Sequence, residues 1–178
     1  MTEAESLERA LHEDISLHPY DTQWPAIFLE ERERLMKLFP DQLIDVQHIG
    51  STSIPDMIAK PVIDLLAGVE SMATADALVA PLIQSGYITS ADFNATLDDR
   101  RWLMRWSKGR RTHHLQLVVY GDSAWQRFIC FRDILRARQD LADRYAGLKR
   151  EIAMQHKVDR EAYTEAKTEF VLSIVCDA

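Results

Sequence analysis

The chain has 178 residues, 47% of them hydrophobic, and a formal net charge of −7 at pH 7. This length and composition favour a single folded domain over residues 1–178, in which we expect residues 1–14 to form a mobile N-terminal arm. The acidic balance argues against general nucleic-acid binding, and no apolar run approaches the roughly 20 residues that span a bilayer. Because the N-terminus lacks an apolar signal segment, we expect a cytoplasmic protein without a membrane partner.

The apolar pattern predicts helices and strands in the following order. We expect a helix over Trp24–Phe39, strands over Leu43–Ile49 and Pro61–Val69, a helix from Ser71 or Thr74 to Ser85, a short strand over Tyr87–Ser90, and a loop over Asp92–Asp99. A hairpin of Arg101–Trp106 and Thr112–Tyr120 follows, then a helix over Ala124–Arg136 and a helical region over Asp140–Val175 with breaks near Gly147 and Val158. The predicted class is α/β of the α+β kind: a small mixed β-sheet flanked by helices, with a helical C-terminal third.

A carboxylate interrupts the second apolar strand. Asp64 stands among Val62, Ile63, Leu65 and Leu66. Because strand side chains alternate, Asp64 shares a face with Val62 and Leu66. A charge in such surroundings is costly unless a cation, a metal ion or a set of N–H donors offsets it. The position therefore predicts that Asp64 belongs to a functional site.

Small and hydroxylated residues precede that strand, namely Gly50, Ser51, Thr52 and Ser53. Such residues before a short helix can form a nest of N–H groups that accepts an anion, although an ordinary tight turn has the same composition. Lys60 lies four residues before Asp64. It can contact a phosphate or pair with Asp64, and a solvated lysine at the start of the strand is the alternative. Together these residues predict a phosphate-binding site beside Asp64.

Histidines accompany the same strands. Adjacent strand residues face opposite sides, so His113 and His114 cannot share one metal cluster without a bulge. One of them can still face the Asp64 site together with His48. A buried structural histidine is the alternative for each. We place His48 and His114 at the rim of the site.

Basic residues gather in the hairpin of this acidic chain, namely Arg100, Arg101, Arg105, Lys108, Arg110 and Arg111. Arg101 and Arg105 alternate with Trp102 and Trp106, so the two arginines can line one face of the strand. Guanidinium groups bind phosphate with two hydrogen bonds, and tryptophan can stack on a base. We predict that Arg101 or Arg105 faces the phosphate site, and a solvated hairpin is the alternative.

Several of these segments resemble those of the GrpB-like proteins, a branch of the nucleotidyltransferase superfamily with the polymerase-beta-type fold. The similar segments are Tyr20 and Trp24, His-Ile-Gly-Ser-Thr-Ser-Ile-Pro at 48–55, Ala-Lys-Pro-Val-Ile-Asp at 59–64, His-Leu-Gln-Leu-Val-Val at 114–119, Phe-Arg-Asp-Ile-Leu-Arg at 131–136, Tyr-Ala-Gly-Leu-Lys at 145–149 and Tyr-Thr-Glu-Ala-Lys-Thr-Glu-Phe-Val at 163–171. The resemblance implies a nucleoside triphosphate or another phosphorylated small molecule as ligand. A related module is fused to dephospho-coenzyme A kinase in some bacteria, which implies an association with that pathway.

The superfamily pattern places three acids around two magnesium ions that bridge the nucleotide phosphates. In this chain Asp64 matches the second acid, whereas Val62 stands at the first position. The third acid is expected within residues 114–117, where the chain has His114 and Gln116. Gln47 stands where relatives often carry glutamate. The resemblance thus implies Mg²⁺ at Asp64, with an incomplete set of carboxylates.

Three functions are consistent with these residues. The first is magnesium-dependent nucleotidyl transfer, in which Asp64 binds metal while Gly50, Ser51 and Lys60 hold the triphosphate. The second is a nucleotide- or phosphate-binding protein without the reaction. The third is a structural or interaction module with a vestigial site. Dependence of nucleotide binding on metal separates the first function from the second.

Overall fold

The computed structural model describes residues 5, 8, 16–155 and 168–174. The elements are α2 (Trp24–Leu38), β1 (Asp45–Ile49), the 3₁₀-helix η1 (Ser51–Ser53), β2 (Ile63–Val69), α3 (Met72–Gln84), β3 (Tyr87–Ile88), α4 (Ala91–Ala95), β4 (Arg101–Ser107), β5 (Arg110–Val119), α5 (Ser123–Ala137) and α6 (Gln139–Gln155). Residues 168–174 are also helical. Apart from residues 5 and 8, the predicted arm over 1–14 lies outside the described residues, as does the predicted break near Val158.

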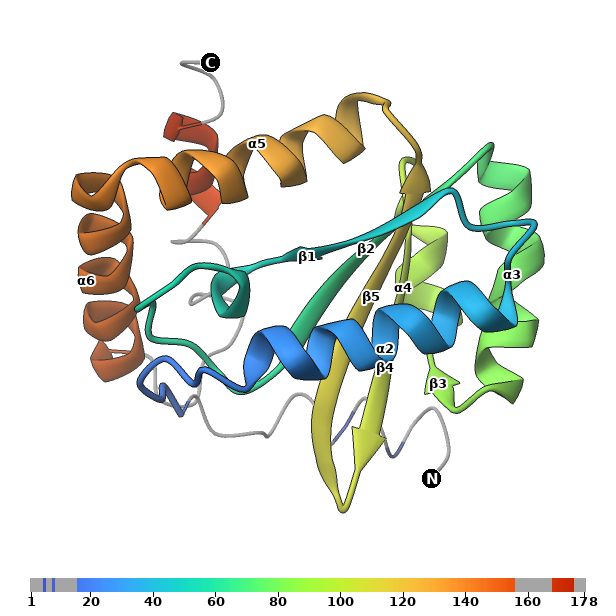
Figure 1. The fold of residues 1–178 in the computed structure, drawn as a ribbon, viewed down its shortest axis with the longest axis horizontal. Helices are drawn as coiled ribbons and strands as arrows, with labels where there is room; N and C mark the ends of the chain where they lie inside the picture. Colours follow the sequence, from blue (N-terminus) through green and yellow to red (C-terminus); the bar gives the residue numbers. More distant parts are fainter. Residues whose placement is uncertain (1–4, 6–7, 9–15, 156–167, 175–178) are drawn as a thin grey trace.

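The five strands form one mixed sheet in the order β1-β2-β5-β4-β3 (Figure 1). The central strands β2 and β5 are parallel, and the other neighbours are antiparallel. The chain between β2 and β5 contains α3, β3, α4 and β4. The last of these, β4, pairs with β5 as the predicted antiparallel hairpin. The predicted mixed sheet flanked by helices, with a helical C-terminal part, is confirmed.

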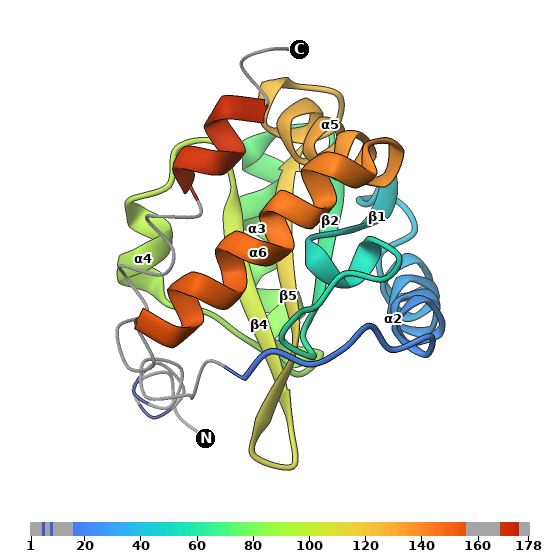
Figure 2. The same cartoon turned by 90° about the vertical axis from the view of Figure 1, so that its left-hand side faces the viewer.

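Helices cover both faces of the sheet. Leu65 and Leu115 face the larger core, which contains Trp24 and Leu35 of α2 together with residues of α3. Leu66 faces a smaller core with Ala124 and Trp125 of α5. Figure 2 shows α6 in front of the sheet and α3 behind it. The period-two pattern of β2 therefore divides its side chains between two helical layers.

In Figure 2, α6 runs in front of the sheet from the end of α5, and its C-terminal half extends away from η1 towards the side of α4. The helix begins where α5 ends, because the two are separated only by Arg138. A third apolar cluster joins these helices to the segment after η1, with Leu135, Tyr145, Ile54 and Ile174 among its buried members. This packing holds α6 against the loop between β1 and β2.

Two local predictions are wrong. The expected loop over Asp92–Asp99 contains α4, which begins after Ser90, whose hydroxyl accepts a hydrogen bond from the Phe93 N–H at 3.1 Å. Asn94 fastens this short helix to β4, since its amide donates to the Trp102 carbonyl at 3.1 Å. Tertiary bonds thus stabilise a helix that has little apolar periodicity. The break expected near Gly147 is absent, because α6 continues through this glycine at a cost of about 1 kcal/mol relative to alanine.

In the described ranges 16–155 and 168–174, we find no helix with the length and apolar character needed to cross a membrane. The longest helix among the described residues, α6, has 17 residues there and carries charged side chains along its length. This agrees with the lack of a long apolar run in the sequence.

Candidate functional site

Gly50 and Asp64 lie against each other in the predicted site. Gly50 follows β1 with φ +70°, a backbone conformation that favours glycine. A β carbon at this position would lie 2.3 Å from Oδ2 of Asp64. Ile49 and Asp64 are direct partners in the antiparallel pairing of β1 with β2, which brings the turn over the carboxylate. Glycine is therefore required here both by backbone conformation and by the closeness of the acid.

Asp64 is bonded on its other side to a histidine. The Nδ1 atom of His114 lies 3.0 Å from Oδ1 of Asp64, and the two residues are partners in the parallel pairing of β2 with β5. Because a carboxylate oxygen accepts, this contact favours the tautomer in which Nδ1 carries the proton. The Nε2 atom of His114 then faces the Arg111 guanidinium at 3.4 Å. An acid, a histidine and an arginine therefore form a line across β2 and β5.

The hydroxyls of Thr52 and Ser53 serve the turn itself. Ser53 Oγ donates to the Gly50 carbonyl at 2.6 Å, and the Ser53 N–H donates to the same oxygen. The Thr52 hydroxyl lies 2.9 Å from Nε2 of His48. Both side chains are buried. The predicted nest of N–H groups therefore lacks the Ser53 N–H, and binding by Thr52 or Ser53 stays a prediction.

His48 lies beneath the turn and not at the rim of the site. It pairs with Leu65 and so faces the α2 layer, where its ring stacks on Phe28 with centroids 4.7 Å apart. Burial is the main cause that lowers its pKa to about 4, and Arg136 and Arg132 lower it further, although Asp64 acts in the opposite direction. The histidine is therefore neutral at pH 7. The placement of His48 at the rim is wrong, whereas His114 does contact Asp64.

Lys149 of α6 binds the Gly50 turn and the loop that follows it. Its Nζ donates to the Ser51 hydroxyl at 2.9 Å and to the Ile58 carbonyl. The side chain is only 1% exposed, and the ammonium lies 4.9 Å from the centroid of the Tyr145 ring. A buried lysine needs such acceptors because a desolvated ammonium is costly. Lys149 thus belongs to the site, although it was not among the site residues predicted from the sequence.

The prediction that Arg101 or Arg105 faces this site is wrong. Arg101 Nε bonds to Asp76 of α3 at 2.6 Å, and Arg105 bonds to Glu31 of α2 at 2.5 Å. Both arginines therefore point into the α2–α3 layer, on the other side of the sheet from Asp64. Alternation correctly indicated that the two share a face, but it could not indicate which face.

A β-bulge explains why Arg111 reaches the site. The pairing of β4 with β5 shifts between Arg105 and Trp106, so that Trp106 pairs with Arg111. With strict alternation, Arg111 would share a face with His113, away from His114. The extra residue in the strand turns Arg111 to the His114 side instead, where its guanidinium also lies 5.9 Å from the Trp106 ring. A bulge of this kind has no clear signal in the sequence.

The described residues do not fit two magnesium ions. Val62, at the expected first acid, is buried and apolar, and Gln116 follows His114 on the same face of β5. Within the described part of the chain, no three histidine, cysteine, aspartate or glutamate side chains cluster as a metal site. Gln116 Oε1 is buried without a hydrogen-bond partner among these residues. Binding of magnesium by Asp64 stays a prediction.

Lys60 lies in the loop before β2, where its carbonyl accepts a hydrogen bond from the Val62 N–H at 2.8 Å. Its side chain is half-buried. Its predicted pairing with Asp64 or with phosphate stays a prediction. Overall, the structure brings Gly50, Ser51, Asp64 and His114 together and adds Arg111 and Lys149 to them.

Known proteins share this sequence pattern and fold. Residues 14–176 match the GrpB protein family. The chain is 36% identical over 152 residues to the UPF0157 protein YqkA of Bacillus subtilis, and 31% identical over 176 residues to a dephospho-CoA kinase of Mycolicibacterium paratuberculosis. These alignments cover 85% and 86% of this chain but only 43% of each relative. The crystal structure of conserved protein GrpB from Enterococcus faecalis is similar, with a TM-score of 0.75 and 29% identity over 89% of this chain and 98% of that one.

Proposed function

This chain belongs to the GrpB family, and from the geometry around Asp64 we propose that it binds a nucleoside triphosphate or another phosphorylated small molecule without a two-metal reaction. The observation that carries the proposal is the placement of two cations near one carboxylate: Arg111 contacts the histidine that is bonded to Asp64, and Lys149 contacts Ser51 in the turn beside Asp64. Asp64 shares His114 with Arg111, while Lys149 holds the hydroxyl of Ser51. These cations provide an excess of positive charge where the Gly50 turn approaches the sheet.

Phosphate recognition follows from the chemistry of these groups. A hydroxyl polarised by an ammonium, as in Ser51 with Lys149, is a good donor to a phosphate oxygen. An arginine offers several N–H donors in a fixed plane, which suits phosphate better than a point charge. His114 contacts both Arg111 and Asp64. If the guanidinium moves towards a ligand, the histidine therefore stays bonded to the carboxylate. In this scheme Asp64 orients the cationic groups and does not need to hold a metal.

The first experiment is calorimetric titration of the full chain with the four nucleoside triphosphates and with coenzyme A precursors. The precursors are included because one relative is named a dephospho-CoA kinase. Each ligand is measured with magnesium and with a chelator. We expect binding under both conditions. Binding that requires magnesium would instead support the nucleotidyltransferase, and the absence of any binding would leave the structural module.

Asp64→Asn tests the role of the carboxylate in the same titrations. If Asp64 orients cations, the variant should bind phosphate ligands as well as the wild type or better, because one negative charge is removed from the site. The gain is expected to be at least about fivefold, because two unit charges 4 Å apart interact by about 1 kcal/mol even in bulk water. Asp98→Asn, at an exposed position, is the control with the same change in net charge. Loss of affinity in the Asp64 variant alone would favour metal binding.

A further inference from the structure

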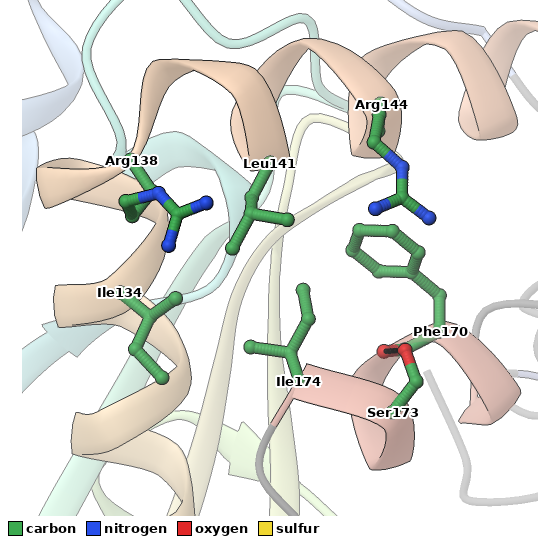
Figure 3. A pocket seen from close by; sticks show the side chains of 7 residues that line it. All are labelled: Ile134, Arg138, Leu141, Arg144, Phe170, Ser173 and Ile174. Carbon is green, nitrogen blue, oxygen red and sulfur yellow. Dashed lines mark hydrogen bonds between the residues drawn. The ribbon is translucent and has the colours of Figure 1, made fainter. Parts of the chain in front are cut away.

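A cavity of about 450 Å³ lies between α5, α6 and the helical residues 168–174 (Figure 3). Its apolar wall comes from Ile134 of α5, Leu141 of α6, and Phe170 and Ile174 of the C-terminal helical segment. None of its lining residues belongs to the sheet or to the Gly50 turn, so this cavity is separate from the Asp64 site. Its volume falls within the range of natural small-molecule sites, which are mostly apolar with a few polar groups.

Two guanidinium groups also line the cavity, that of Arg144 in α6 and that of Arg138 between α5 and α6. Figure 3 shows the side chains of Arg138 and Arg144 on either side of Leu141, with the Arg144 guanidinium beside the Phe170 ring. Arg144 lies 5.8 Å from the centroid of that ring. Arg138 is bonded to Asp140 at 2.9 and 2.8 Å, whereas Arg144 has no carboxylate partner in the part of the chain that the structure describes. The cavity therefore combines an apolar wall with one arginine that no carboxylate of the described residues neutralises.

We propose that this cavity binds a small amphipathic anion, with an apolar ring or short acyl body and one carboxylate, sulfonate or phosphate group. The body packs against Ile134, Leu141 and Ile174, which lie together on one side of the cavity. The anionic group contacts Arg144, which is held over Phe170 and is exposed to solvent on its outer side. Burial of the ring supplies most of the affinity, and the arginine selects for negative charge.

The cavity also adjoins the lysine that holds the Gly50 turn. Phe170 stacks on Tyr145 with centroids 5.2 Å apart, and Tyr145 in turn contacts the Lys149 ammonium. A ligand that moves Phe170 would therefore act on the side chain next to Lys149. These contacts offer a physical route between the cavity and the phosphate site, but ligand binding in the cavity does not require that the phosphate site be functional.

The probe for this cavity is 8-anilinonaphthalene-1-sulfonate, which has aromatic rings, one sulfonate and a fluorescence that rises in apolar surroundings. We expect one saturable site per chain. Ser173→Trp fills the cavity and should weaken binding at least tenfold. Leu172→Trp is the matched control, because Leu172 is 53% exposed and does not line the cavity. This control should bind the probe within twofold of the wild type.

The charge preference needs a second pair of variants. Arg144→Gln should weaken binding of the sulfonate probe about tenfold and leave the uncharged probe N-phenyl-1-naphthylamine within twofold. Arg150→Gln, at an exposed position of the same helix, should change neither. Ser173→Asp tests the charge preference from the C-terminal segment. It adds a negative charge to the lining with far less bulk than tryptophan, so it should weaken binding of the sulfonate probe. Competition with aryl carboxylates, short fatty acids and aryl phosphates then separates the sources of the anion.

Equal binding by the wild type and Ser173→Trp would overturn the proposal, because the probe would then lie elsewhere. If Arg144→Gln lost the same affinity for the charged probe and for the uncharged one, the cavity would have no preference for anions, and this result would also overturn the proposal. Ser173→Asp keeps the test valid if the tryptophan variant unfolds, which near-ultraviolet circular dichroism would reveal. Sedimentation could also show that the chain self-associates and that only the monomer binds the probe. That result would overturn the proposal, because a second copy of the chain would then occupy the cavity.

Discussion

Lys149 donates a hydrogen bond to the hydroxyl of Ser51 at 2.9 Å, although 98 residues separate them in the sequence. The same ammonium donates to the Ile58 carbonyl, so one side chain of α6 binds both η1 and the loop that leads from η1 towards β2. The helix that covers the sheet therefore also fixes the turn against Asp64. This contact decides whether the turn and the acid stay together.

Replacement of Lys149 tests this contact. Lys149→Met preserves the apolar stem but leaves Ser51 Oγ and the Ile58 carbonyl without their donor. We expect a loss of about 1–3 kcal/mol in the free energy of unfolding, measured by urea denaturation, and weaker phosphate binding by calorimetry. Lys37→Met is the control, because Lys37 is an exposed lysine at the end of α2. Equal stability of both variants would mean that Lys149 does not hold the turn.

Gly50→Ala should damage the site more than its backbone conformation explains. The new methyl group would lie 2.3 Å from Oδ2 of Asp64, so either the turn or the acid must move. Gly121→Ala is the matched control, because Gly121 has φ +77° and nothing within 4 Å of its added β carbon. We expect about 1–2 kcal/mol of destabilisation from conformation in both variants and at least 1 kcal/mol more for Gly50→Ala.

The extra destabilisation should disappear in a double variant. Asp64→Ala removes the carboxylate that collides with the new methyl group, so Gly50→Ala in that background should cost no more than Gly121→Ala. Urea denaturation of the four chains of this cycle measures the coupling between positions 50 and 64. A coupling energy near zero would show that the loop adapts without disturbing Asp64.

The two faces of the hairpin should respond differently to loss of an arginine. Arg111→Gln removes the guanidinium beside His114 and should lower the affinity for phosphate ligands about tenfold. Arg101→Gln removes the same charge on the other face, where Arg101 bonds to Asp76, and should leave that affinity within twofold. Calorimetry with inorganic phosphate and one nucleotide makes the comparison. Equal effects would indicate a general electrostatic attraction and no defined contact.

Acid should destabilise the fold through two buried histidines. Burial lowers the pKa of His48 and of His113 to about 4, from an ordinary value of 6.5. Below about pH 6.5 the unfolded chain therefore binds more protons than the folded one. The free energy of unfolding is therefore unaffected by these histidines above that pH. It falls as the pH is lowered towards 4, by about 1.4 kcal/mol per pH unit for each histidine.

His113→Gln should roughly halve this pH dependence, because one of the two titrating side chains is replaced by an uncharged one. Urea denaturation at several pH values between 7 and 4 gives the slope. His18→Gln is the control, since His18 is exposed. The slope, and not the stability at pH 7, is the decisive quantity, because any change at a buried position can alter stability. An unchanged slope in the His113 variant would show that this histidine takes up its proton without disturbing the fold.

The elements of the sheet could be predicted because their signals are local. Alternation in β2 and β5 divides the buried leucines between two faces, and it correctly placed His113 and His114 on opposite sides. The order of a glycine turn and an acid-bearing strand also indicated that Gly50 and Asp64 belong together. Such patterns depend only on residues close in sequence, so no knowledge of the fold was needed.

The cations of the site could not be predicted from the sequence, because their positions depend on contacts between residues far apart in the chain. The choice of face for Arg101 and Arg105 depends on which helix supplies Asp76 or Glu31, and alternation carries no such information. Arg111 reaches His114 through a bulge, which shifts the phase of alternation within a single strand. Lys149 reaches Ser51 because α6 packs against the segment that follows η1, which is far from α6 in the sequence. Local patterns were enough to predict the strands, the glycine turn and the acid beside it, whereas contacts between distant segments select the cations that lie near that acid.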